Sequence, residues 1–231
     1  MPKGANIMKK LFITLIVSVF LMGMGWVPYP PDEQPIPPAE QPTASDGLPH
    51  EPILMIHGLY GNPLSWNRLK SWLADQGYDP NLMYAPQVTD NFSMCSLAHI
   101  EQIEDEIDLI RSETGAEKVT LIGHSRGGTA IMAFMRFSPD NDLVDNVITL
   151  AGANNYYCDT VYGRPPTDDT PGDALYTSIY TVPSDGILPA NMARLDGAHN
   201  VEYTDLSHSD YILTEAAFED VLEALKGGGS N

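Results

Sequence analysis

The chain has 231 residues, of which 43% are hydrophobic, and this is enough for one well-packed domain. Its 31 acidic and 12 basic residues give a formal net charge of −19. Such a surface repels nucleic acid and anionic membranes, which argues against both as partners. We find no loop with the ligand spacing of a calcium site, so the acidic residues are interpreted as a solvated surface.

The first segment, 1–27, is typical of a secretory signal peptide. Two lysines precede the apolar run 11–22, and small residues follow it. The run is too short to span a bilayer comfortably, although an uncleaved membrane anchor is the alternative. We therefore expect a secreted or periplasmic protein.

The next segment, 28–49, carries many prolines and few large apolar residues. This composition predicts an extended linker or arm that packs poorly. The compact domain is expected to cover 50–226, and the glycine-rich end, 227–231, is expected to be a flexible tail.

The domain is predicted to begin with a strand at 52–56, because this apolar run suits a strand covered on both faces. The strand leads into the turn His57-Gly58-Leu59-Tyr60-Gly61-Asn62, which precedes a helix-like stretch at 66–75. Such a turn can aim a backbone N–H at the carbonyl oxygen of a bound ester, and Leu59 is the expected donor. His57 is expected to fix this loop rather than to react.

Beyond this turn, strands alternate with helices, which indicates an α/β fold with a mostly parallel, doubly wound sheet. A short strand at 79–85 is followed by an amphipathic helix that starts at Leu97 and ends at Gly115. His99 lies on that helix and is expected to be structural. The remaining elements are predicted as strands at 119–122, 146–150, 178–182 and 201–205, and helices at 129–135 and 214–226.

Both cysteines, Cys95 and Cys158, fall in loops that should follow strands of the sheet. In an exported protein, a disulfide between them is natural. Two buried free thiols are the alternative.

The central motif is Gly123-His124-Ser125-Arg126-Gly127, which lies between a predicted strand and a predicted helix. This strand–turn–helix context is the one a nucleophile elbow requires, in which a strained turn exposes the serine Oγ. The two glycines let neighbouring backbone pass closely, and the helix N-terminus favours developing negative charge. The N–H of Arg126 is the second expected oxyanion donor, while its side chain is expected near the site mouth or in solvent. A chance Gly-Ser-Gly loop is the alternative.

A serine hydroxyl needs a base to take its proton, and the base needs a third group to orient it. His208 lies just past the carboxyl end of the last predicted strand and is the expected base, whereas His199 precedes that strand, at the wrong edge. Asp185 follows the predicted strand 178–182 and is the expected acid, with Asp196 as the alternative.

At these positions the chain resembles the small, lidless secreted lipases of the Bacillus type, within the α/β-hydrolase superfamily. The resemblance covers roughly 52–229. It is carried by Met55-Ile56-His57-Gly58, Gly123-His124-Ser125-Arg126-Gly127-Gly128, Leu150-Ala151-Gly152-Ala153-Asn154, Leu175-Tyr176-Thr177-Ser178-Ile179-Tyr180, Arg194-Leu195-Asp196-Gly197-Ala198 and Leu206-Ser207-His208.

The resemblance implies a minimal α/β-hydrolase fold, with about six mostly parallel strands, helices on both faces and no large lid. The roles it implies are Ser125 as nucleophile, Asp185 as acid, His208 as base, and Leu59 and Arg126 as oxyanion donors through their backbone N–H groups. Those lipases usually carry Ala at the position of Gly123 and Met at that of Arg126, so substrate preference is expected to differ.

The expected activity is that of a triacylglycerol lipase or carboxylesterase that works through an acyl-enzyme. We expect a monomer with no cofactor and no metal, acting on esters or acylglycerols, for which a lipid interface is not required. The alternatives are the same machinery acting on polyesters, amides or acyl transfer, and a non-catalytic lipid-binding module. Few apolar residues lie between 150 and 178, so no amphipathic lid is expected.

Overall fold

The computed structural model describes residues 51–162 and 169–227. All of these belong to one unit of the chain, Ala44–Asn231. The predicted signal peptide, the predicted linker and most of the predicted tail lie outside the described residues. Within the described residues, no helix has both the length and the apolar character needed to cross a membrane.

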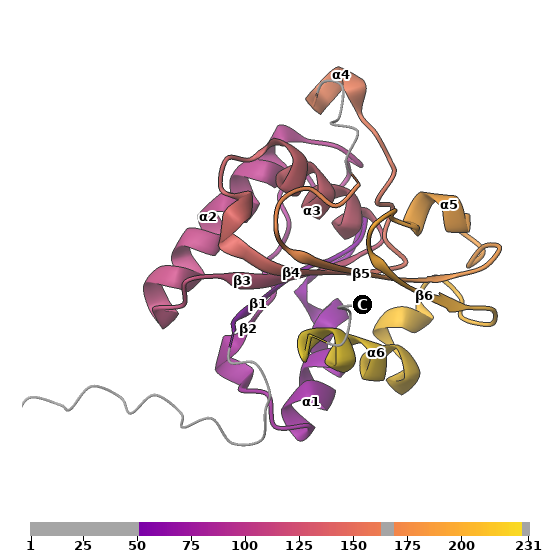
Figure 1. Cartoon of the computed structure of the whole chain (residues 1–231), viewed down its shortest axis with the longest axis horizontal. Helices are drawn as coiled ribbons and strands as arrows, with labels where there is room; N and C mark the ends of the chain where they lie inside the picture. Colours follow the sequence, from indigo (N-terminus) through magenta and orange to yellow (C-terminus); the bar gives the residue numbers. More distant parts are fainter. Residues whose placement is uncertain (1–50, 163–168, 228–231) are drawn as a thin grey trace, which may run out of the picture. The chain divides into compact units, whose positions relative to one another are not determined.

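Six parallel strands form one sheet in the order β2-β1-β3-β4-β5-β6 (Figure 1). The strands are β1 Ile53–Ile56, β2 Met83–Tyr84, β3 Val119–His124, β4 Val144–Leu150, β5 Leu175–Thr181 and β6 His199–Tyr203. Strands β1 and β3 are buried along their whole length, as a parallel sheet covered on both faces requires. The predicted fold class is confirmed.

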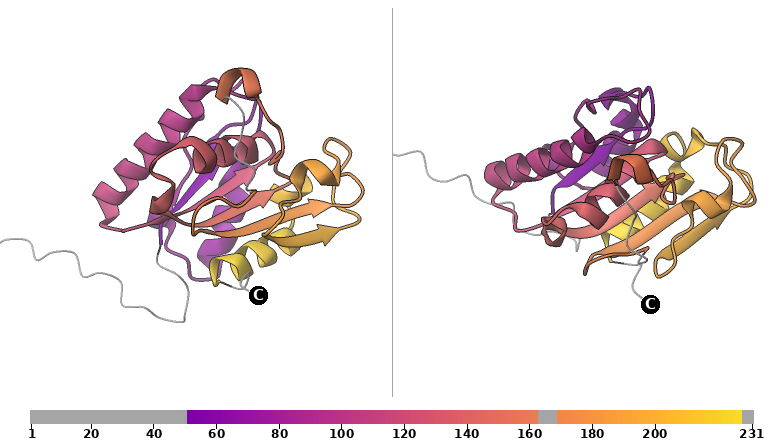
Figure 2. Two further views of the ribbon diagram at one scale, coloured as in Figure 1. Left: turned by 45° about the horizontal axis from the view of Figure 1, so that its top comes forward. Right: turned by 90° about the horizontal axis from the view of Figure 1, so that it is seen from above.

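Helices cover both faces of the sheet: α2 and α3 lie on one side, and α1 and α6 lie on the other (Figures 1 and 2). The helices are α1 Asn67–Asp75, α2 Leu97–Thr114, α3 Arg126–Phe137, α4 Asp159–Tyr162, α5 Ala190–Ala193 and α6 Glu215–Leu225. Short 3₁₀ helices are η1 Pro63–Trp66, η2 Pro80–Leu82, η3 Asn141–Leu143 and η4 Asp210–Ile212.

The core consists of two apolar layers that the sheet separates. Successive side chains of a strand point to opposite faces, so Leu54 packs in the layer with α2 and α3, while Met55 packs in the layer with α1 and α6. Each fully buried side chain of this size contributes roughly 1.5–3 kcal/mol to the free energy of folding. Because both layers press on β1 and β3, the ends of these two strands are held firmly.

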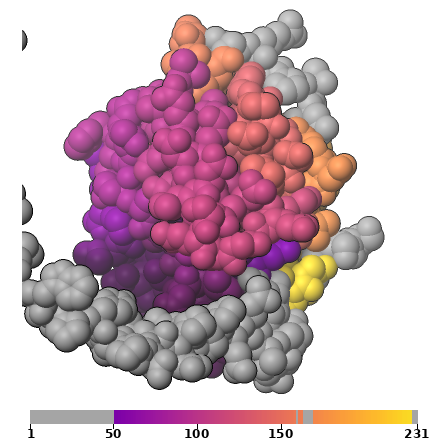
Figure 3. Space-filling view, turned by 90° about the vertical axis from the view of Figure 1, so that its left-hand side faces the viewer, coloured from indigo at the N-terminus to yellow at the C-terminus, as the bar shows by residue number. Residues whose placement is uncertain are grey.

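Helix α2 shows how one amphipathic helix closes a layer. Its isoleucines at 100, 103, 107 and 110 are buried, while acidic residues such as Glu101 and Asp108 face solvent. Gly115, with φ of 73°, ends the helix in the left-handed conformation that favours glycine. The outer side of the segment that contains α2 lies on the face of the molecule seen in Figure 3, where it is coloured magenta.

Several strand predictions were wrong at their boundaries: β2 covers only Met83–Tyr84 of the predicted 79–85, and β4 starts at Val144 rather than 146. Strand β6 covers His199–Tyr203 rather than 201–205, and β5 starts at Leu175 rather than 178. The polar residues His199 and Asn200 pair with Thr177 and Ser178 through backbone register, although they lack the apolar pattern on which the prediction relied. At this edge of the sheet, backbone pairing sets the boundary.

Since all six strands run in the same direction, their carboxyl ends share one edge of the sheet. The loops after β1, β3, β5 and β6 all leave from this edge, where sites form in open parallel sheets. These loops hold the residues that the sequence singles out.

Candidate active site

Ser125 occupies the tight turn between β3 and α3 in a strained conformation. Its φ of 56° and ψ of −122° lie in a region that side-chain-bearing residues rarely adopt. The end of β4 holds this turn: the Ser125 N–H donates to the carbonyl of Leu150 at 3.1 Å, and the Ser125 carbonyl accepts from Ala153 N–H at 2.9 Å. The surrounding sheet therefore fixes the backbone that presents Oγ.

The two glycines of the motif allow this turn because they lie against backbone. A Cβ at Gly123 would come within 2.7 Å of the Ile131 side chain and 2.8 Å of the Gly127 carbonyl carbon. A Cβ at Gly127 would overlap the carbonyl oxygen of Ile56. Side chains at either position would push α3 away from β1 and β3.

The structure brings Ser125, His208 and Asp185 together in one hydrogen-bonded chain. His208 Nε2 lies 2.8 Å from Ser125 Oγ, and His208 Nδ1 lies 2.7 Å from Asp185 Oδ2. Because a carboxylate only accepts, Nδ1 carries the ring proton and Nε2 accepts from the serine hydroxyl. We call these three residues the relay chain.

Backbone contacts fix the carboxylate of the relay chain. Asp185 Oδ1 accepts from the N–H groups of Ile187 at 2.8 Å and Leu188 at 2.7 Å. In addition, the His208 N–H donates to the Asp185 carbonyl at 3.1 Å. The loops after β5 and β6 are therefore tied together through backbone as well as through the imidazole.

His124 lies beneath the relay chain, where its Nε2 donates to the His208 carbonyl at 2.8 Å. The two rings are tilted, with centroids 5.0 Å apart. Burial lowers the pKa of His124 to about 4, so its ring is neutral near pH 7. This contact ties the end of β3 to the loop that carries His208.

The turn after β1 lies directly against Ser125. A Cβ placed on Gly58 would be 3.1 Å from Ser125 Cβ. Among the residues that the structure describes, the next N–H, that of Leu59, has no protein acceptor. Arg126 is the first residue of α3, so its N–H has no partner within the helix. Both predicted oxyanion donors are thus backbone groups beside the elbow.

His57 fixes this turn from below. Its Nδ1 donates to the Gly58 carbonyl at 2.9 Å, and its Nε2 accepts from the Val88 N–H at 3.0 Å. Burial lowers the pKa of His57, which favours the neutral ring that this pattern needs. The contacts are those of a loop-fixing residue.

The alternative residues do not join the relay chain. Asp196 is exposed and pairs with Arg194 at 3.2 Å. His199 begins β6, at the amino edge of the sheet, where it is in register with Thr177. Chain order and strand polarity separate these two residues from His208 and Asp185.

The prediction for the Arg126 side chain was wrong. It is fully buried instead of lying at the site mouth or in solvent. Its Nη1 lies 3.1 Å from His99 Nε2, and its Nη2 lies 3.2 Å from the His57 carbonyl. The start of α3 packs under loops that come from elsewhere in the chain, which the local sequence does not reveal. The methionine that the resembled lipases carry here was the one available signal of a buried position.

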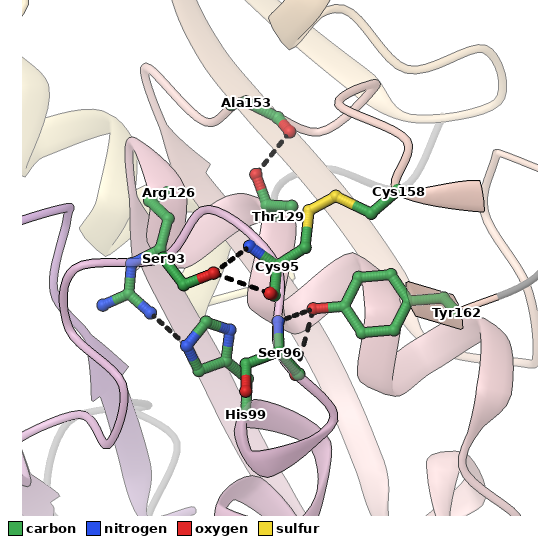
Figure 4. Close-up of a disulfide and its surroundings, with 9 residues drawn as sticks. All are labelled: Ser93, Cys95, Ser96, His99, Arg126, Thr129, Ala153, Cys158 and Tyr162. Atoms are coloured by element: carbon green, nitrogen blue, oxygen red, sulfur yellow. Dashed lines mark hydrogen bonds between the residues drawn. A yellow bond between two sulfur atoms is a disulfide. The ribbon is translucent and has the colours of Figure 1, made fainter. Parts of the chain in front are cut away.

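Cys95 and Cys158 form a disulfide, with their Cα atoms 6.2 Å apart (Figure 4). It joins the loop before α2 to the loop before α4. Tyr162 strengthens this junction, since its hydroxyl accepts from the Ser96 N–H at 2.8 Å and lies 3.1 Å from the Ser96 carbonyl. Tyr162 belongs to no sequence motif, so its place beside the disulfide could not be predicted.

Comparison with known proteins relates the chain to one fold family. The model of the alpha/beta hydrolase fold family matches residues 51–175. "Probable lipase C16A3.12c" of Schizosaccharomyces pombe is 31% identical over 140 residues, which cover 48% of this chain and 31% of that protein. The triacylglycerol lipase of Vibrio cholerae is 32% identical over 109 residues, covering 45% and 32%. The chain spans about a third of the length of these relatives.

Solved structures show the same fold. The mature lipase BlEst2 of Bacillus licheniformis superposes with a TM-score of 0.58 at 17% identity, covering 84% of this chain and 96% of that one. The lin2722 product of Listeria innocua superposes with a TM-score of 0.57 at 14% identity, covering 76% and 93%. At these identities the likeness concerns the fold alone.

Proposed function

The chain belongs to the alpha/beta hydrolase fold family, and on that premise we propose that it is a serine hydrolase that cleaves carboxylic esters through an acyl-enzyme. Relatives named as lipases support a hydrolase. The observation that carries the finer proposal is the relay chain, with hydrogen bonds of 2.8 Å and 2.7 Å about His208.

In the proposed reaction, His208 takes the hydroxyl proton of Ser125 as Oγ attacks the ester carbonyl carbon. The N–H groups of Leu59 and Arg126 stabilise the negative oxygen of the tetrahedral intermediate, and each such donor is worth about 10²–10³ in kcat. His208 then gives its proton to the leaving alcohol. Water, activated by the same imidazole, attacks the acyl-enzyme and releases the acid.

Asp185 keeps the imidazole in the tautomer that can accept from Ser125 and stabilises the imidazolium that forms. Its second carboxylate oxygen is held by two backbone N–H groups. These contacts hold the carboxylate in place against the imidazole Nδ1.

Acylglycerols and other apolar esters are the proposed substrates. An aromatic pair flanks the turn that carries Leu59: Tyr60 is 67% exposed, Phe92 is 76% exposed, and their ring centroids are 5.5 Å apart. Apolar surface on the turn that adjoins Ser125 through Gly58 suits an acyl chain. We also propose that the chain is a small lipase without a lid, that it is exported from the cell, and that it is a monomer.

Turnover by Ser125→Ala tests the proposed reaction. We expect p-nitrophenyl esters of increasing acyl length and emulsified triglyceride to be hydrolysed by the wild type, with kcat at least about 10⁴-fold lower in the variant. Ser112→Ala on α2, which removes an exposed serine hydroxyl, is the matched control and should keep full activity. Equal rates for wild type and Ser125→Ala would overturn the proposal.

The absence of a lid is tested in the same assays. If nothing covers Ser125, soluble short-chain esters are hydrolysed without an interface, and the rate rises smoothly with concentration. A steep rise only above the solubility limit would contradict it. The molar mass from light scattering during gel filtration tests whether the protein is a monomer. The N-terminal sequence of the exported protein tests whether the predicted signal peptide, 1–27, is removed.

A further inference from the structure

The Arg126 guanidinium is an unusual group to find beneath this site. The side chain is fully buried, and the acceptors it contacts are a carbonyl, an amide oxygen and an imidazole, all uncharged. Burial lowers the pKa of Arg126, which expresses the cost of removing a cation from water, and the nearby Asp90 carboxylate offsets only part of this cost. A methionine or leucine of similar size would avoid that cost. The guanidinium therefore calls for a role beyond packing.

Its first contact reaches the turn after β1. Arg126 Nη2 donates to the carbonyl of His57 at 3.2 Å. That carbonyl belongs to the peptide just before the one that carries the Leu59 N–H. Arg126 thus has its own backbone N–H beside Ser125, and its side chain binds the turn that carries the Leu59 N–H.

Its second contact reaches the far end of the same turn through Asn91. Arg126 Nη2 lies 3.5 Å from Asn91 Oδ1. Asn91 Nδ2 in turn donates to the Gly61 carbonyl at 2.8 Å, and the Asn91 carbonyl accepts from the Tyr60 N–H at 3.2 Å. The turn is therefore held on both sides of Leu59.

The turn needs such support because it is strained. Tyr60, directly after Leu59, has φ of 57°, in the left-handed region that costs a side-chain-bearing residue free energy. A strained peptide keeps its orientation when its neighbours over-determine it. Without those contacts, relaxation at Tyr60 would rotate the Leu59–Tyr60 peptide and, through Leu59, shift the neighbouring peptide that carries the Leu59 N–H.

His99 on α2 completes the arrangement. Arg126 Nη1 lies 3.1 Å from His99 Nε2, which accepts only when the ring is neutral (Figure 4). Burial and the adjacent guanidinium lower the pKa of His99, which favours that neutral ring. Cys95 lies four residues before His99, in the loop before α2, and its disulfide with Cys158 ties this loop to the segment before α4. We call Arg126, Asn91 and His99 the loop brace.

We propose that the Arg126 side chain is a positioning residue, which through the loop brace orients the Leu59 N–H toward the oxyanion formed at Ser125. The proposal rests on the proposed ester hydrolysis. It makes the two oxyanion donors a coupled pair, since one is the backbone of Arg126 and the other is held by its side chain.

Arg126→Met tests the proposal, because it keeps the backbone N–H and removes the guanidinium. We expect kcat on p-nitrophenyl butyrate, per active serine titrated with a phosphonate, to fall about tenfold, with KM within twofold. The inhibition constant of a phenylboronic acid, whose tetrahedral adduct places an oxygen between the donors, should rise by about the same factor. Thermal stability should stay level or rise, since a buried cation is removed.

Two further variants keep the test independent of folding at position 126. Asn91→Ala, in a half-buried loop, should lower kcat and boronate affinity in the same way. The double variant should lose less than the product of the two single losses, because both act through one brace. Arg68→Met, at an exposed position on α1, is the matched control and should leave both readouts unchanged.

The outcomes separate this proposal from the one on which it rests. Unchanged kcat and boronate affinity in Arg126→Met and Asn91→Ala would overturn the positioning role while the wild type still hydrolyses esters. A loss that disappears after active-serine titration, together with a lower melting temperature, would show a packing role and also overturn it. A wild type that neither hydrolyses esters nor reacts with the phosphonate would instead overturn the proposed function.

Discussion

The relay chain and the loop brace meet at the same serine, but they are built differently. The relay residues Ser125, Asp185 and His208 each follow a strand, β3, β5 or β6, at the shared carboxyl edge of the sheet. The brace residues Asn91 and His99 come from a loop and a helix, and reach the site through the buried side chain of Arg126.

The relay chain and the loop brace owe their precise geometry to different kinds of contact. The relay chain is aligned by the sheet, whose register is fixed by many backbone hydrogen bonds on either side. The brace relies on a few side-chain contacts around one cation, so single substitutions should weaken it without breaking the fold. Changes to the relay chain should abolish chemistry, whereas changes to the brace should reduce it.

Asp185→Asn breaks the relay chain and should have the largest effect. The amide can donate to Nδ1, which favours the wrong imidazole tautomer, so we expect kcat for p-nitrophenyl butyrate to fall about 10³–10⁴-fold. Asp196→Asn, at the exposed alternative carboxylate, is the matched control and should be unchanged. If the Asp196 variant lost activity and the Asp185 variant kept it, the acid would be misassigned.

Removing the disulfide, which lies near His99 of the loop brace, should lower the free energy of unfolding. The bridge closes a loop with a sequence separation of 63 residues, for which chain entropy gives about 4 kcal/mol of the free energy of unfolding. Urea unfolding of wild type and of the double variant Cys95→Ala with Cys158→Ala measures this difference. Equal midpoints with equal slopes would show that the bridge contributes nothing to stability.

Acid should lower the free energy of unfolding, because His124 is buried beneath the relay chain. Its pKa in the folded protein, about 4, lies below the ordinary value of 6.5, so the unfolded chain binds more protons between these pH values. Stability is therefore full above pH 6.5 and falls as the pH drops toward 4, by up to about 3 kcal/mol from this residue. His208 and Asp185 are the titratable groups that face it.

Urea unfolding at pH 7 and pH 4.5 checks this expectation in the wild type and in His124→Gln, which cannot gain a proton. The variant should lose less stability between the two pH values. An identical loss in both proteins would assign the acid sensitivity to other groups, of which the buried His57 and His99 have pKa values shifted in the same direction.

Gly128→Ala and Gly115→Ala should have the smallest effects, and they test whether close packing against the sheet supports the elbow. The Cβ of Gly128→Ala would lie 2.6 Å from Asn154 Oδ1 and 2.8 Å from Gly152 Cα, so we expect roughly 1–3 kcal/mol of destabilisation. Gly115→Ala meets nothing within 4 Å but has φ of 73°, so strain alone should cost about 1 kcal/mol. Melting temperatures that rank the two variants in the opposite order would contradict the packing argument.

Much of the fold and the residues of the relay chain could be predicted from the sequence, for a physical reason. Apolar runs such as 52–56 specify buried strands, and the glycines around Ser125 specify a tight turn. Strand polarity then decides between His208 and His199, because only one of them can lie at the carboxyl edge. Local pattern and chain order carry this information.

The loop brace could not be predicted, because its members are far apart in the sequence and follow no pattern. Asn91 lies in an irregular loop, and nothing in the sequence distinguishes it from other surface asparagines. The charge of Arg126 predicted an exposed side chain, whereas tertiary packing buries it. The start of β6 was also missed, since His199 and Asn200 pair by register without apolar character.

Covalent trapping shows whether Ser125 is the nucleophile. Wild type and Ser125→Ala would be treated with a p-nitrophenyl phosphonate ester, and p-nitrophenol release and the mass of each tryptic peptide would be measured. Nucleophilic attack by Ser125 predicts one equivalent of p-nitrophenol and one phosphonyl group on the peptide that contains Ser125, with neither in the variant. Label on another residue, or steady ester hydrolysis by a wild type that takes up no label, would rule out Ser125 as the nucleophile.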